Sequence, residues 1–267
     1  MNRIKAAFAQ LRSQGRIGIA AFLTVGYPDR GSTMPLLRAM VEGGLDFIEL
    51  GVPFSDPLAD GATIQKAGHK ALENGITLRD CLDVCSEARD QFPLIPILLM
   101  GYYNPVLSYG IERFAADAER AGLDGLIVVD LPPEEAGPLQ KMCGARGIDL
   151  VFLLAPTSTD ERIGRVCEAS SRLIYCVSLT GVTGARRELD SGLPEFLARV
   201  RSRTDLPLVV GFGISTRAHV EAVAPYAESV AVGSALINLI EDAPPSQRVE
   251  RVRGYVEELS GKGVLET

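Results

Sequence analysis

Eight short apolar segments recur along the chain and alternate with amphipathic segments of helical period. The apolar segments are residues 17–24, 45–52, 96–102, 125–131, 149–156, 172–179, 207–213 and 229–236. Each one is typical of a strand that is buried on both faces, as strands of parallel sheets are. Strict alternation of strands and helices also predicts right-handed crossover connections. The sequence therefore predicts an α/β fold built on a parallel sheet.

The length of the chain favours a closed barrel over an open sheet. The 267 residues hold eight strand–helix units, and (β/α)₈ barrels take about 250 residues. The first strand lacks the GxGxxG turn of dinucleotide-binding open sheets, and no linker or low-complexity stretch divides the chain. We therefore expect residues 1–267 to form a single (β/α)₈, or TIM, barrel domain. An extra N-terminal helix with an apolar face of Ile4, Ala7, Phe8 and Leu11 is expected to close the barrel bottom.

The composition limits which partners and which cellular location we expect for this chain. No segment approaches the roughly 18 uninterrupted apolar residues of a membrane span, so we expect a cytoplasmic protein without membrane contact. With a net charge of −7 and no basic stripe, nucleic acid is not an expected partner. An anionic substrate would have to be captured by local groups, because the overall charge repels it. The five cysteines, Cys81, Cys85, Cys143, Cys167 and Cys176, are expected to be buried free thiols.

Glu49 places a carboxyl group in the middle of an apolar strand. Because side chains alternate along a strand, it shares one face with Phe47 and Gly51. If that face points into the barrel, the carboxyl keeps its proton to a higher pH than a surface glutamate does. Such a group suits general acid–base catalysis. The alternative is a structural ion pair, but no Lys or Arg lies near the C-terminal ends of the first five strands.

Asp60 lies in the long connection that follows the Glu49 strand. About 50 residues separate the second and third strands, which implies an inserted loop, and barrel active sites lie on loops at this end of the strands. Taken alone, Asp60 could equally be the N-cap of the helix that follows Gly61. Its origin on the Glu49 strand favours a catalytic role. Asp56 lies in a Ser-Asp-Pro sequence, which by itself is typical of a turn.

Glycine-rich turns follow the last two strands, at residues 211–215 and 232–235. In barrels these turns commonly present backbone N–H groups to a phosphate, helped by the N-terminus of a short helix. Residues 178–192 form a long Gly-rich segment after the sixth strand, which suits either a surface loop or a lid over the phosphate.

The residue types at the C-terminal ends of the strands narrow the reactions that a site there could catalyse. All five lysines and both histidines fall on helix patterns or the C-terminal tail, which disfavours Schiff-base catalysis and a metal site. Four aromatic side chains fall at or near strand C-terminal ends: Phe22, Tyr102, Tyr175 and Phe212. Each alone is more often core filler, but together they suit a flat apolar substrate group.

These motifs closely resemble the alpha subunit of tryptophan synthase. The resemblance is carried by residues 22–29, 48–65, 98–105, 128–135, 179–186, 211–215 and 233–235. The matched segments occur in order from the first strand to the last, and the motif over 48–65 is highly specific. The resemblance implies a lyase of tryptophan biosynthesis that cleaves indole-3-glycerol phosphate to indole and glyceraldehyde 3-phosphate by retro-aldol chemistry.

The resemblance also implies roles for individual residues. Glu49 would be the acid–base group, and Asp60 would hold the indole N–H and stabilise positive charge on the ring. Tyr175 would pack beside Glu49, and Phe22, Tyr102 and Phe212 would flank the indole. Gly184, Gly213, Gly233 and Ser234 would cradle the phosphate, while Thr183 on the lid would order Asp60.

A partner follows from the same resemblance. The family works as a heterotetramer of two alpha and two beta subunits, in which indole passes through a tunnel to pyridoxal phosphate in the beta subunit. No cofactor is then expected in this chain. Positions that match the expected contact with the beta subunit are Pro53, Asp56, Pro57, Asn104 and Pro132.

Two departures and three rival interpretations stay open at this point. Ala62 stands where many members carry proline, and Arg187 stands where a small polar residue is expected. A phosphoribosyl-type isomerase barrel would share the phosphate site, but it would need an acid where this chain has residues 22–24, Phe-Leu-Thr. The chain could instead serve mainly as an allosteric partner, or act as a stand-alone lyase that releases free indole.

Overall fold

The computed structural model describes residues 2–177, 191–211 and 213–262. The strands of these segments are β1 (Gly18–Thr24), β2 (Phe47–Gly51), β3 (Ile97–Gly101), β4 (Gly125–Val128), β5 (Asp149–Val151), β6 (Leu153–Leu154), β7 (Ile174–Val177), β8 (Leu208–Gly211) and β9 (Ser229–Val232). All pairings between them are parallel. The expected parallel sheet is therefore confirmed.

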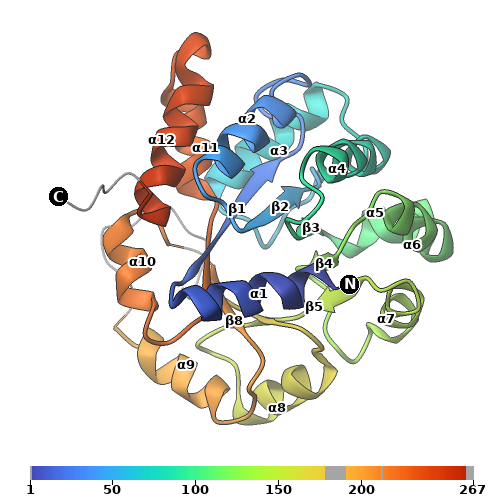
Figure 1. Cartoon of the computed structure of the whole chain (residues 1–267). Coiled ribbons are helices and arrows are strands. Elements are labelled where there is room, and N and C mark those ends of the chain that lie inside the picture. The colour runs from blue at the N-terminus through green and yellow to red at the C-terminus, as the bar shows by residue number, and fades with distance from the viewer. Residues whose placement is uncertain (1, 178–190, 212, 263–267) are drawn as a thin grey trace.

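Helices cover the outside of the sheet (Figure 1). The helices of the described segments are α1 (Arg3–Gln14), α2 (Thr33–Glu42), α3 (Ala62–Glu73), α4 (Leu78–Gln91), α5 (Tyr103–Tyr109), α6 (Ile111–Arg120), α7 (Gly137–Gly144), α8 (Asp160–Ala169), α9 (Leu193–Arg201), α10 (Arg217–Val223), α11 (Ser234–Asp242), η1 (Pro245–Gln247) and α12 (Arg248–Ser260). Several of them end at a glycine in the left-handed region, as Gly75 does after α3 with φ +76°.

The barrel closes through a strand that changes partner. The sheet order runs β5-β4-β3-β2-β1-β9-β8-β7-β6, and β5 and β6 are separated only by Phe152. β5 pairs with β4, β6 pairs with β7, and the carbonyl of Phe152 accepts a hydrogen bond of 3.1 Å from the Tyr175 N–H. The fifth expected strand, 149–156, is thus two short strands that join the two edges of one barrel. The expected (β/α)₈ fold class is confirmed.

The long connection after the second strand contains both a loop and an added helix. The loop from β2 to α3 spans only residues 52–61, and the extra length forms a helix, α3, before the usual crossover helix α4. α3 is helical because its small residues Ala67, Gly68 and Ala71 bury one face, while polar side chains take the other. It packs against α11. The site therefore gains a helix that runs from the Asp60 loop to α11.

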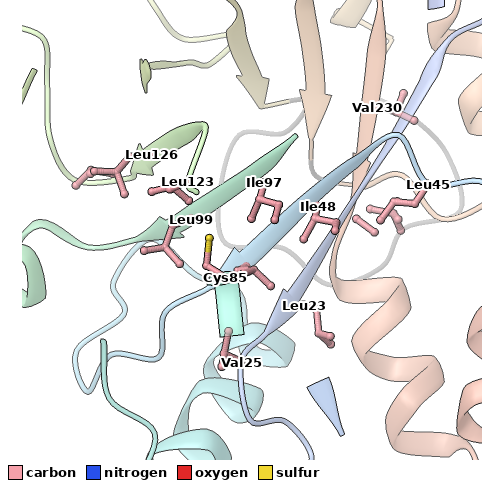
Figure 2. Close-up of a cluster of buried hydrophobic side chains, with 14 of the residues drawn as sticks. Leu23, Val25, Leu45, Ile48, Cys85, Ile97, Leu99, Leu123, Leu126 and Val230 are labelled. Atoms are coloured by element: carbon pink, nitrogen blue, oxygen red, sulfur yellow. The ribbon is translucent and has the colours of Figure 1, made fainter. Parts of the chain in front are cut away.

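Side chains on the outer face of the sheet pack against the helices. Figure 2 shows Ile48, Ile97 and Leu99 of the strands near Cys85 of α4, all of them buried. Burial of about 25 cal/mol per Å² of apolar surface makes this layer the main source of stability. Because outward positions are filled this way, the alternating positions of each strand face the barrel interior.

The N-terminal helix fills the lower interior. Ile4, Phe8 and Leu11 of α1 join the buried interior side chains of the strands, and the Phe8 and Phe47 rings lie 4.8 Å apart. A Cβ at Gly18 would lie 2.6 Å from Leu11 Cδ1, so a side chain there would have to displace the end of Leu11. In Figure 1, α1 lies across the ring of strands. The expected plug at the barrel bottom is confirmed, which leaves the opposite end of the barrel for a site.

Candidate active site

Glu49 lies on the inner face of β2 and is only 2% exposed. In the sheet it is level with Phe22 of β1 and Leu98 of β3. The Tyr175 hydroxyl donates a hydrogen bond of 3.4 Å to Glu49 Oε2. Burial raises the pKa of Glu49 to about 8, and the hydrogen bond from Tyr175 offsets only part of this rise. The carboxyl is therefore protonated at neutral pH, as its position in the sequence predicted.

The structural alternative for Glu49 is not supported. Among the described residues, no salt bridge to Glu49 is present, and Tyr175 is the group that acts on its pKa besides burial. Burial and the neighbouring carboxyl raise the pKa of Tyr175 well above its ordinary value. The tyrosine hydroxyl thus stays protonated and remains a donor to Glu49. A buried acid held by one neutral donor is suited to proton transfer.

Two glycines make room for the aromatic side chains around Glu49. A Cβ at Gly211 of β8 would lie 2.4 Å from the Tyr175 ring, and one at Gly51 of β2 would lie 2.3 Å from Phe22. Sequence reasoning missed both roles. The available signal was a glycine inside a strand pattern, which often marks a close approach of another group.

Asp60 lies in the loop before α3 and is half-buried. Burial raises its pKa to about 6, and a hydrogen bond with Tyr102 opposes that rise. The Tyr102 oxygen also accepts a hydrogen bond of 2.9 Å from the Ala59 N–H. The N-cap of α3 is Gly61, and no side chain caps this helix. The N-cap alternative for Asp60 is therefore wrong.

Two adjoining pockets open at the C-terminal end of the strands. The first has a volume of about 630 Å³ and is lined by Phe22, Asp60, Ile64, Met100, Tyr175 and residues 213–215 and 231–235. The second, of about 380 Å³, shares Phe22, Asp60, Ile64 and Met100 with the first and extends to Tyr102 and the 52–57 loop. Glu49 lines neither pocket and contacts the first one through Tyr175.

One end of the first pocket is made of backbone and a helix N-terminus. Gly213 has φ +80°, a conformation that favours glycine. α11 begins at Ser234 after Gly233, and no side chain caps its free N–H groups. A Cβ at Gly233 would meet Phe22 Cβ at 3.5 Å, an ordinary contact. The structure brings the three predicted residues Gly213, Gly233 and Ser234 together here.

A family model for the tryptophan synthase alpha chain matches residues 8–262. The chain belongs to the tryptophan synthase alpha chain family. A tryptophan synthase alpha chain of Roseiflexus sp. (strain RS-1) is 56% identical over 261 residues, which are 98% of this chain and 100% of the relative. Family membership identifies the chain as a lyase of tryptophan biosynthesis and removes the isomerase alternative.

Solved structures agree with this assignment. A structure of Mycobacterium tuberculosis tryptophan synthase matches with a TM-score of 0.89 and 38% identity, over 99% of both chains. A structure from Aquifex aeolicus VF5 matches with a TM-score of 0.90 and 39% identity, over 98% of both chains. The barrel fold is thus shared with these solved structures.

Two residues that line the first pocket were not expected from the sequence, Ile64 of α3 and Met100 of β3. Ile214 and Ser215, which also line it, belong to the predicted turn over 211–215. Met100 could have been found by strand alternation, because it lies two residues after the inward-facing Leu98. Ile64 could not, since the packing of α3 on α11 decides where its side chain points.

Some predicted residues lie outside the described part of the chain. These are Thr183, Gly184, Phe212 and Arg187, together with the expected lid segment except for its residues 191 and 192. Ala62, the other departure from the family pattern, is the first residue of α3. Proline is favoured at this helix position because its missing N–H has no partner there, and alanine fits it equally well.

The residues expected to contact a beta subunit differ in their exposure to solvent. Asp56, Asn104 and Pro132 are exposed, whereas Pro57 is half-buried and Pro53 is buried. Pro53 lines the second pocket instead of the surface. Leu58 is 90% exposed and Leu107 is 48% exposed, and both lie within a few residues of these positions. Sequence reasoning did not single out either leucine.

The described residues contain no group of three side chains that could hold a metal ion. Their helices also include none long and apolar enough to cross a membrane. Lys5, Lys66, Lys70 and Lys141 lie on helices, and Lys262 follows the last one. The expectation that no lysine stands at a strand end is therefore confirmed.

Proposed function

We propose that the two pockets bind indole-3-glycerol phosphate and that Glu49 and Asp60 carry its cleavage to indole and glyceraldehyde 3-phosphate. The observation that carries the proposal is the fully buried Glu49 carboxyl, whose pKa is raised to about 8. It contacts, through Tyr175, a pocket that also exposes Asp60 and an uncapped helix N-terminus. This combination supplies an acid, a carboxylate and an anion site around one ligand.

The phosphate would bind at the N-terminus of α11. The N–H groups of its first turn, with those of Gly213 and Ile214, would supply donors, and the helix would add the positive end of its dipole. Such local donors are needed because the net charge of −7 repels an anion. Gly184 would complete the cradle, and Thr183 would order Asp60, as the family resemblance implies.

The acid–base work would fall to Glu49. Its protonated carboxyl donates a proton to C3 of the indole, which places positive charge on the ring. The side-chain hydroxyl then loses its proton to the glutamate while the carbon–carbon bond breaks and its electrons return to the ring. An aldehyde and indole result, and the proton given to C3 is recovered from the hydroxyl. General acid–base catalysis of this kind contributes about 10²–10⁴-fold in rate.

Asp60 would act as the ionised partner of Glu49. With a pKa raised only to about 6, it is mostly a carboxylate at pH 7. It would accept the indole N–H and stabilise the charge that develops on the ring. Phe22, Tyr102 and Phe212 would flank the indole plane. Two carboxyl groups with separated pKa values thus divide the acid and the electrostatic role.

A beta subunit is the expected partner of the alpha chain. We propose that it binds over Asp56, Pro57, Asn104 and Pro132, in a complex of two alpha and two beta subunits. The exposed Leu58 and Leu107 would be covered in that complex. Pyridoxal phosphate would belong to the beta subunit, which would receive indole through a tunnel. We expect the complex in the cytoplasm.

The direct test is release of indole from indole-3-glycerol phosphate by the purified chain, with and without a beta subunit. We expect measurable release by the chain alone and faster release when the beta subunit is added. Release only in the complex would favour a role as allosteric partner. High turnover without any partner would favour a stand-alone lyase. No release under either condition would contradict the proposal.

The pH dependence of kcat/KM should be bell-shaped. Below a pH of about 6, Asp60 becomes protonated and loses the charge that the ring needs. Above a pH of about 8, Glu49 loses the proton that it must donate. Activity should therefore be highest between these values, and initial rates from pH 5 to 9.5 measure it. A flat profile through pH 8 would contradict the role of Glu49.

Tyr175→Phe should move one limb of this profile. The tyrosine hydrogen bond lowers the pKa of Glu49, so its removal should raise the alkaline limit above 8. The acid limb, which depends on Asp60, should stay at about 6. A fall of the alkaline limit would mean that Tyr175 does not act on Glu49 as the geometry indicates.

Gly233→Ala should weaken substrate binding without unfolding the chain. The added methyl group meets Phe22 at an ordinary distance of 3.5 Å, yet it stands at the pocket wall beside the helix N-terminus. We expect KM to rise about 10-fold or more, since charge-assisted hydrogen bonds to an anion are worth about 1.5–3 kcal/mol. Gly164→Ala on α8, where the Cβ meets nothing within 4 Å, is the matched control and should leave KM unchanged.

A further inference from the structure

Thr24 carries a buried hydroxyl that the chain leaves unpaired. The residue ends β1, on the same face of the strand as Phe22, and is only 2% exposed. In the described part of the chain, Thr24 Oγ1 is the one buried side-chain nitrogen or oxygen without a hydrogen-bond partner. Burying a hydroxyl without a partner costs free energy, and valine would fill the same space without that cost. A partner from outside the chain resolves this contradiction.

Thr24 is one of the residues that line the second pocket. Asp60 and Tyr102 line it too, while the remaining walls are mostly apolar. The Tyr102 oxygen already accepts the Ala59 N–H and shares a hydrogen bond with Asp60. Thr24 Oγ1 is therefore an uncommitted acceptor in a narrow apolar space, which suits a flat aromatic molecule with a single N–H donor.

The second pocket leads from the first pocket toward the loop after β2. It shares Phe22, Asp60 and Met100 with the first pocket, and it reaches Pro53, Phe54 and Pro57 in the loop after β2. A small aromatic product that leaves Asp60 toward this loop passes Thr24. Phosphate does not fit here, because the residues that line the pocket include the Asp60 carboxyl and no cationic side chain.

We infer that Thr24 is a further binding residue, whose Oγ1 accepts a hydrogen bond from the N–H of released indole in the second pocket. The inference rests on the proposed function, since it takes indole as the product. Thr24 then holds indole after Asp60 has released it, between the reaction site and the surface loop. This assigns a ligand contact to an otherwise unexplained buried hydroxyl.

The test compares indole with benzothiophene, a similar bicyclic ring without an N–H group. The chain contains no tryptophan, so indole binding can be followed by its own fluorescence and benzothiophene by competition. Thr24→Val should bind indole about 3- to 10-fold more weakly, the range of one neutral hydrogen bond. Its affinity for benzothiophene should not change. Thr24→Ser should keep the affinity for indole.

Thermal unfolding separates this role from a structural one. Because the hydroxyl has no partner in the free chain, Thr24→Val should have a Tm equal to or above that of the unmodified chain. Thr33→Val is the matched control: Thr33 is equally buried, and its Oγ1 accepts the Gly26 N–H at 2.9 Å. That variant should lose Tm and keep the ratio of indole to benzothiophene affinity.

Two results would overturn the inference. One is equal affinity of Thr24→Val and the unmodified chain for indole. The other is a lower Tm of Thr24→Val with an unchanged affinity ratio, which would identify a permanently bound water as the partner. If the unmodified chain neither releases nor binds indole, the proposed function fails. If it does both while Thr24→Val binds indole equally well, only this inference fails.

Discussion

Glu49→Gln is expected to lower indole formation by about 10²–10⁴-fold, the range for loss of a general acid–base group. Glutamine has nearly the same shape and can keep a hydrogen bond with Tyr175, but it cannot donate and recover a proton. Binding of the phosphate end should survive, because that end consists of backbone N–H groups around Gly213 and Gly233. Steady-state indole release measures the loss, and calorimetric titration with glycerol phosphate measures the retained binding.

The same substitution, which lowers activity, should raise the stability of the folded chain at alkaline pH. The folded-state pKa of Glu49 is about 8, against an ordinary value of 4.5. The folded chain therefore binds a proton more tightly than the unfolded chain, and stability falls as pH rises from about 4.5 to about 8. Each pKa unit corresponds to about 1.4 kcal/mol. Glu49→Gln removes this effect, so the variant should gain several kcal/mol relative to the unmodified chain at pH 9.

Controls make the Glu49 result specific. Glu112→Gln changes an exposed carboxyl on α6 and should leave both activity and the pH dependence of stability unchanged. Denaturant titrations at pH 5 and pH 9 measure the stability difference. Near-normal turnover of Glu49→Gln would remove Glu49 from the mechanism. If the difference in stability between Glu49→Gln and the unmodified chain were the same at pH 5 and pH 9, this would contradict the buried, protonated state of Glu49.

Asp60→Asn is expected to reduce kcat/KM by about 10²–10³-fold, the cost of losing one electrostatic contact aimed at developing charge. Asparagine can still accept the indole N–H but lacks the negative charge that stabilises the protonated ring. Stability should stay equal or rise slightly, because the half-buried carboxylate is replaced by a neutral group and no helix cap is lost. Initial rates and thermal unfolding measure the two effects.

The outcome of this substitution separates two physical roles. A large loss of kcat/KM at unchanged Tm indicates electrostatic catalysis. A lower Tm with nearly normal kcat/KM would instead indicate that Asp60 supports the start of α3. Asp83→Asn, at an exposed position on α4, is the control and should change neither quantity. The acid limb of the pH profile should also disappear in Asp60→Asn, since its titrating group is gone.

The sequence predicted the barrel and the burial of Glu49 because both depend on local periodicity. Alternation within 45–52 places Phe47, Glu49 and Gly51 on one face, and eight such strands in one chain of this length leave few other folds. The plug formed by α1 follows from its apolar face in the same way. These features are properties of neighbouring residues, which a sequence displays directly.

Other features depended on contacts between distant segments. That Gly61, not Asp60, caps α3 is decided by the path of the loop, and that Gly211 makes room for Tyr175 is decided by which strands are neighbours. The unpaired hydroxyl of Thr24 has no signal in the sequence, because a missing partner is visible only when all surrounding atoms are in place. The sequence by itself determined the class of fold and the two carboxyl groups. The tertiary structure decided their environment, since burial and hydrogen bonding come from residues far apart in the chain, and these set the two pKa values on which the proposed chemistry depends.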